Sequence, residues 1–91
     1  MDNLEAYFFN KEVVVDALYF RDNGTLASYP KHMVVDDQNI TFTESGLQYV
    51  VRRGRQMLQM FDMTDGQKQY QLELNPDEQR WKLLHVAPVG A

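Results

Sequence analysis

Turn-forming residues recur along this chain at short intervals, and this spacing constrains the fold more than any other feature. No apolar stripe with helical periodicity extends over any length. Turn signals about eight to twelve residues apart are typical of an antiparallel β meander. The signals are Asn23-Gly24, Asp36-Asp37-Gln38-Asn39, Glu44-Ser45-Gly46, Thr64-Asp65-Gly66 and Asn75-Pro76-Asp77-Glu78.

The stretch Leu47–Val86 shows the pattern most clearly. Two extended segments, Leu47–Val51 and Met57–Met63, flank an arginine-bearing bend. After the next two turns come Gln69–Leu74, which alternates between apolar and polar residues, and Trp81–Val86. This alternation predicts which side chains of Gln69–Leu74 lie in the core, whereas both faces of Trp81–Val86 are mixed and we favour Trp81 and Leu83 as its inward side chains. We expect Tyr70, Leu72, Leu74, Trp81 and Leu83 to point inward, and Gln69, Gln71 and Glu73 to point to water.

These segments predict a mainly β fold, a small curled antiparallel meander of six to seven strands that forms a barrel or roll. Closure is expected because a flat sheet leaves one face bare and two edges open. Asp2 or Asn3 could cap one short N-terminal helix through about Asn10, although Phe8-Phe9 suits a strand equally well. Without repeats or linkers, residues 1–91 are expected to form a single domain.

Composition narrows the class of protein. Hydrophobic residues make up 44% and charged residues 24% of the chain, which is ordinary for a globular domain. The chain has no cysteine, which excludes disulfides and thiolate metal ligands. No apolar run approaches the roughly 20 residues that span a bilayer, and the first residues are acidic rather than signal-like. We therefore expect a cytoplasmic protein that does not act in the membrane.

The net charge of −4 is unevenly distributed. Residues 1–46 contain eight acids and three bases, whereas residues 47–91 contain five acids and six bases. An acidic chain is disfavoured on polyanions because phosphate contacts need positive charge. Nucleic-acid binding is therefore expected only if a local basic patch provides it.

The bend at Arg52, Arg53 and Arg55 is the one candidate for such a patch. Three of the nine basic residues fall within four positions there. Guanidinium groups on a hairpin tip suit phosphate or carboxylate, and the nearby Tyr49 could stack on a base. The alternative is a solvated turn whose arginines pair with the acidic N-terminal half.

The segment Met57–Met63 is a candidate apolar interface. Methionine side chains adapt to varied apolar partners. On a strand, Met57, Phe61 and Met63 share one face, whereas Leu58 and Met60 share the other, so one set faces outward unless something covers it. We consider two interpretations, an exposed strip of Met57, Met60, Phe61 and Met63 used for dimerisation or a partner, and ordinary burial within the fold.

Catalytic and metal-binding signals are weak. His32 and His85 are the only histidines, and no local spacing brings them together with carboxylates. No phosphate-binding glycine loop, nucleophile elbow or zinc-binding helix motif occurs. We therefore expect no cofactor and no metal, and catalysis has no support in the sequence.

The hypothesis that follows is a non-catalytic protein-interaction or self-association module, with a protein partner or a homo-oligomer such as a dimer. Two alternatives stay open. One is binding of nucleic acid or a phosphorylated ligand through Arg52, Arg53 and Arg55 with Tyr49. The other is a small-ligand-binding β-barrel with a pocket lined by Trp81, Tyr70 and Phe61.

Overall fold

The computed structural model describes residues 7–22 and 25–89. These residues form seven β-strands and no helix, which confirms the mainly β prediction. The strands are rich in β-branched and aromatic residues, which fit a pleated, half-buried surface. They are β1 (Tyr7–Asp22), β2 (Thr25–Val35), β3 (Gln38–Thr41), β4 (Glu44–Arg53), β5 (Gln56–Thr64), β6 (Lys68–Asn75) and β7 (Arg80–Pro88).

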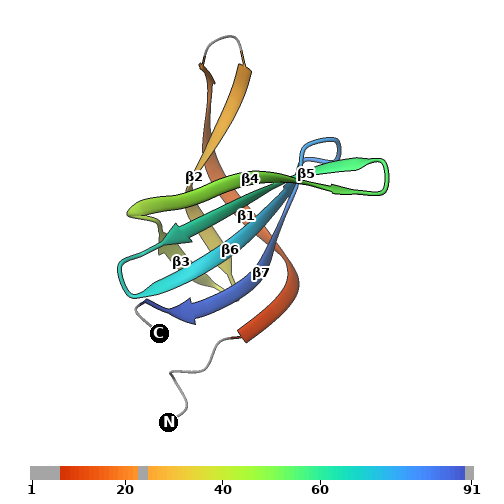
Figure 1. Cartoon of the computed structure of the whole chain (residues 1–91). Helices are drawn as coiled ribbons and strands as arrows, with labels where there is room; N and C mark the ends of the chain where they lie inside the picture. Colours follow the sequence, from red (N-terminus) through yellow and green to blue (C-terminus); the bar gives the residue numbers. More distant parts are fainter. Residues whose placement is uncertain (1–6, 23–24, 90–91) are drawn as a thin grey trace.

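All seven strands lie in one antiparallel sheet, in the order β3-β2-β1-β7-β6-β5-β4 (Figure 1). The long strand β1 joins its two halves. Tyr7–Val13 pairs with β7, whereas Val14–Asp22 pairs with β2. The far part of the β1–β2 hairpin therefore extends past β7, and Figure 1 shows it projecting from the rest of the sheet.

The sheet is open, so the expected closure into a barrel or roll is wrong. Its edge strands are β3 and β4, which do not pair with each other. Within the part of the chain that the structure describes, the two edges are linked through the connection Phe42–Thr43. The Phe42 N–H donates to the Lys31 carbonyl at 2.9 Å, and the Thr43 N–H donates to the Thr64 carbonyl at 2.8 Å. These two hydrogen bonds hold the connection between β3 and β4 in place. The four residues of β3 pair with β2 and form no ladder of hydrogen bonds with β4.

The expected N-terminal helix is wrong over Tyr7–Asn10, which begins β1 and pairs with β7. Pairing with a neighbouring strand prevails over the local helix signal because it satisfies the backbone groups of the sheet edge. The rest of that expected helix falls in residues 1–6, outside the described residues.

The core lies along rows of side chains that cross the central strands on one face. Phe61, Leu72 and Leu83 are paired across β5, β6 and β7, and all three are buried. Leu74 is paired with Trp81, which packs on Phe61 with ring centroids 5.2 Å apart. The predicted inward set is confirmed. The buried core cluster is Val13, Met33, Phe42, Phe61, Met63, Tyr70, Leu72, Leu74, Trp81 and Leu83.

Two of the expected turns have the backbone that their residues favour. Asp36 and Asp37 have φ angles of 49° and 65°, as a type I′ hairpin turn requires, and aspartate tolerates this region. Asn75 accepts hydrogen bonds from the N–H groups of Asp77 and Glu78 through its side-chain oxygen. The expected Asn23-Gly24 turn lies outside the described residues, between the paired residues Asp22 and Thr25.

Candidate functional site

The arginine-bearing bend is the tip of the β4–β5 hairpin, as the sequence predicted. Arg53 pairs with Gln56, so the loop consists of Gly54 and Arg55. Gly54 has a φ angle of 63°, which suits the first central position of a type II′ turn. All three arginines of the bend are exposed. Figure 1 shows this tip extending beyond the neighbouring strands.

One arginine of the bend is already engaged. Arg53 Nη2 lies 3.1 Å from Oε2 of Glu73, whose side chain is only 5% exposed. Glu73 was expected to point to water, and this expectation is wrong because the β4–β5 hairpin and the ion pair cover it. Arg52, by contrast, shares a face with its cross-strand neighbour Met57, opposite to the face of Arg53.

The Tyr49 side chain, expected to stack on a base, is already engaged with the strand β6. Its hydroxyl oxygen accepts a hydrogen bond of 2.9 Å from Nε2 of Gln71 on β6. The side chain is nevertheless 40% exposed. The binding of an anionic ligand by Tyr49, Arg52, Arg53 and Arg55 stays a prediction, and the engagement of Arg53 leaves two arginines for it.

The proposed apolar interface on β5 is mostly inside the fold. Met60, Phe61 and Met63 are buried, with exposed fractions of 6%, 2% and 1%. Only Met57 is exposed, at 46%. An exposed strip of all four side chains is therefore absent from this structure, and ordinary burial describes three of them.

The pocket expected inside a barrel is not formed either. Trp81, Tyr70 and Phe61 are buried against other side chains of the core, and the open sheet encloses no barrel interior. Tyr70 packs edge-on against Phe42, with ring centroids 5.6 Å apart. These aromatic side chains fill space in the core.

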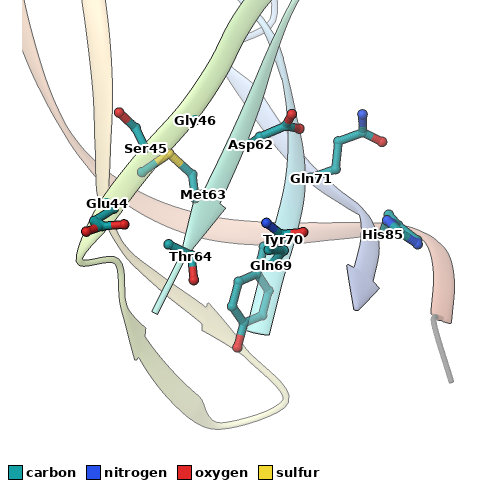
Figure 2. Close-up of a pocket in the computed structure, with 10 residues that line it drawn as sticks. All are labelled: Glu44, Ser45, Gly46, Asp62, Met63, Thr64, Gln69, Tyr70, Gln71 and His85. Atoms are coloured by element: carbon teal, nitrogen blue, oxygen red, sulfur yellow. The ribbon is translucent and has the colours of Figure 1, made fainter. Parts of the chain in front are cut away.

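An open pocket of about 380 Å³ lies instead on the surface of β4–β7 (Figure 2). Asp62, Gln71 and His85 are directly opposite one another on β5, β6 and β7, so they form a polar row across the sheet. On β4 the register shifts between Ser45 and Gln48, and Gly46 lies next to Asp62. The missing side chain of Gly46 leaves room above Asp62, since a Cβ there would lie 3.5 Å from the Asp62 Cβ.

The electrostatics of this polar row are mild. Burial raises the pKa of Asp62, and the charge of nearby His85 lowers it by a smaller amount. Ser45 is paired with Met63 on β5, and Figure 2 shows its hydroxyl directed away from Asp62, whereas His85 lies two strands from Asp62, on β7. A serine nucleophile needs the histidine between itself and the carboxylate, so this order does not suit that chemistry. The side chains of this row can accept hydrogen bonds from a polar ligand and donate hydrogen bonds to it.

A second perturbed carboxylate, Asp65, stabilises the β5–β6 turn. Burial acts to raise its pKa, but hydrogen bonds from the backbone N–H groups of Lys68 and Gln67 and from the Tyr70 hydroxyl lower the pKa overall. Burial, followed by the interaction with Asp65, raises the pKa of Tyr70. The Tyr70 hydroxyl therefore has a structural role, because it donates a hydrogen bond to Asp65 and so stabilises the β5–β6 turn.

Neither histidine joins a metal cluster. Within residues 7–22 and 25–89, no three histidine or carboxylate side chains gather closely enough to hold a metal ion. His32 lies on β2, where its Nδ1 is 3.6 Å from a carboxylate oxygen of Asp16. The same described ranges contain no helix that is long and apolar enough to cross a membrane.

The edge strand β4 is the surface that the sequence did not identify. Nine of its ten residues are exposed, and the tenth is half-buried. Leu47 is 69% and Val50 56% exposed. The apolar pattern of this strand is readable in the sequence, but its position at a sheet edge is not, because that depends on the order of all seven strands.

No family model matches the chain, and no curated protein or solved structure matches it significantly. A functional inference therefore rests on the geometry of the described residues alone.

Proposed function

We propose that this protein is a non-catalytic interaction module that binds an extended segment of protein along β4. The observation that carries the proposal is a ten-residue edge strand with exposed apolar side chains. An unpaired edge offers a row of N–H and C=O groups to another strand, and strand addition is a recurrent mode of protein recognition.

Natural sheets usually block their edges with lysine, proline, bulges or very short strands. The opposite edge, β3, has only four residues. The segment Ser45–Val51 contains no charged residue and no proline. Its one irregularity is the register shift between Ser45 and Gln48, after which the ladder is regular to Arg53. The edge from Gln48 to Arg53 is thus suited to pairing.

The direction of the backbone groups follows from the hairpin. A two-residue loop closes on a hydrogen-bonded pair, here Arg53 and Gln56. The ladder alternates from that pair, so Tyr49 and Val51 bond to β5. Gln48, Val50 and Arg52 direct their N–H and C=O groups away from the sheet.

Val50 provides a backbone test of this proposal. Val50→Pro removes an outward N–H that β5 does not use, whereas Val50→Thr keeps the N–H and the β-branched shape. Tagged full-length protein serves as bait in a cell lysate, and bound proteins are identified. We expect wild type and Val50→Thr to retain the same proteins, and Val50→Pro to lose them.

Circular dichroism melting of each bait confirms that the variants are folded. Retention of one set of proteins by all three folded baits would contradict binding through the β4 backbone. So would a wild-type bait that captures neither another protein nor further copies of itself.

A further inference from the structure

We infer that the extended segment bound by β4 is the β4 strand of a second copy of this chain, paired antiparallel about a twofold axis at Tyr49. This inference rests on the function proposed above and names the partner. A twofold interface uses the same patch on both chains, so the patch must be complementary to itself. The strand β4 meets this requirement in its backbone, its charges and its apolar side chains.

The backbone fits an axis at Tyr49. Gln48 and Val50 both direct their N–H and C=O groups outward, as derived from the hairpin register. An axis at Tyr49 places Gln48 of each copy opposite Val50 of the other, so both pairs exchange two hydrogen bonds. Tyr49 then meets its own copy as a non-hydrogen-bonded pair, in which side chains lie closest.

The charges of β4 favour the antiparallel direction. Glu44 lies at one end of the strand, and the bend with Arg52, Arg53 and Arg55 lies at the other. Among the described residues, neither Glu44 nor Arg52 nor Arg55 takes part in an ion pair. Antiparallel pairing brings Glu44 of each copy to the arginine bend of the other. Parallel pairing would place arginines against arginines.

The apolar side chains lie near the axis. Tyr49 is 40%, Val50 56% and Leu47 69% exposed in the isolated chain. About the proposed axis, Leu47 of one copy lies near Val51 of the other, and the two Tyr49 rings are neighbours. Aromatic and β-branched cross-strand pairs stabilise sheets, so pairing covers side chains that are otherwise in water.

A cysteine at the axis tests the geometry directly. The chain has no cysteine, so Tyr49→Cys introduces a single thiol in each copy. In a non-hydrogen-bonded antiparallel pair the Cα atoms are about 4.5 Å apart, within disulfide range. Mild oxidation should convert Tyr49→Cys to a covalent dimer on a non-reducing gel. Asp77→Cys, on the exposed β6–β7 turn, is the matched control and should remain largely monomeric.

Charge reversal tests the direction of pairing. We expect Glu44→Arg to weaken self-association about tenfold, because it opposes arginines at both ends of the interface. Adding Arg52→Glu and Arg55→Glu to Glu44→Arg restores opposite charges and should recover most of that loss. Arg53 is kept in all variants because it holds Glu73. Sedimentation equilibrium over a concentration series measures the dissociation constants.

The outcomes separate this inference from the function on which it rests. A wild-type protein that stays monomeric throughout the series overturns the inference, as does equal oxidation of Tyr49→Cys and Asp77→Cys. Failure of the triple charge variant to regain affinity overturns the antiparallel direction. If the lysate bait still loses other proteins through Val50→Pro, the proposed function survives with a different partner. If that dependence is also absent, both fail.

Discussion

Removal of Arg53 should reveal how much the β4–β5 hairpin depends on Glu73. The Glu73 side chain is 5% exposed, and Arg53, which is 62% exposed, pairs with it at 3.1 Å. Leaving a buried carboxylate without its partner costs about 3–5 kcal/mol. Two features reduce this value, since Arg53 is largely in water and Lys82 lies opposite Glu73 on β7. We therefore expect Arg53→Ala to lower the free energy of unfolding by about 2 kcal/mol.

The reverse substitution should behave differently. Glu73→Leu leaves behind two cations that are not fully buried, the exposed Arg53 and the half-buried Lys82, and places an apolar side chain opposite Met60. We expect stability between unchanged and about 1 kcal/mol higher. In the Glu73→Leu background, Arg53→Ala should then cost less than about 0.5 kcal/mol, because no buried charge remains to be paired.

Urea denaturation followed by the fluorescence of Trp81, the single tryptophan, measures these values. One low protein concentration is used throughout because self-association would shift apparent stability. Arg52→Ala is the matched control, an exposed arginine of the same bend without an ion pair among the described residues. Equal effects of Arg53→Ala and Arg52→Ala would refute the reasoning.

Three further predictions concern other parts of the sheet. Asp62→Asn should stabilise the protein at neutral pH, because the pKa of Asp62 is raised in the folded state and its contribution to stability therefore falls as pH rises above the unfolded pKa. Asp65→Asn should destabilise the protein at neutral pH, because the pKa of Asp65 is lowered in the folded state and its contribution is lost as pH falls through the folded pKa. Urea denaturation from pH 3 to pH 7 measures the free energy of unfolding of each variant relative to wild type; this difference should rise with pH for Asp62→Asn and fall for Asp65→Asn, and slopes of equal sign would contradict both predictions. Leu72→Ala, at a fully buried position, should cost about 3–5 kcal/mol by urea denaturation, and a loss below about 1 kcal/mol would speak against tight packing there. Gly54→Ala should cost about 1 kcal/mol, because the φ angle of 63° strains an L-residue although the surrounding space is open; a Tm equal to that of wild type would contradict this.

The local pattern of the sequence predicted the β6 strand and the arginine bend correctly. Period-two alternation in Gln69–Leu74 placed Tyr70, Leu72 and Leu74 in the core, where the structure buries them. The arginine bend was expected between two extended segments and is the two-residue tip of the β4–β5 hairpin. Such features depend on neighbours in the chain, so residue order is sufficient to predict them.

The exceptions depend on contacts between distant residues. Glu73 occupies a polar position of the alternating strand, yet Arg53, twenty residues away, holds it in a buried ion pair. Met60 and Met63 looked equally able to face a partner, but neighbouring strands cover both. Pairing decides burial here, and period-two patterns carry no information about which strands become neighbours.

The sequence by itself determined the strand class, the turns at Asp36-Asp37, Thr64-Asp65-Gly66 and Asn75-Pro76-Asp77-Glu78, and the inward face of Gln69–Leu74, because backbone preference and side-chain alternation are local. The turn expected at Glu44-Ser45-Gly46 is wrong, since these residues begin β4. Only the tertiary structure decided that the sheet stays open and that β4 lies at its edge. The strand order places β1 between β2 and β7, which leaves β3 and β4 without a common ladder. The β4 backbone is exposed because of that order, since β4 is the last strand of the sheet and has a neighbouring strand, β5, on one side only.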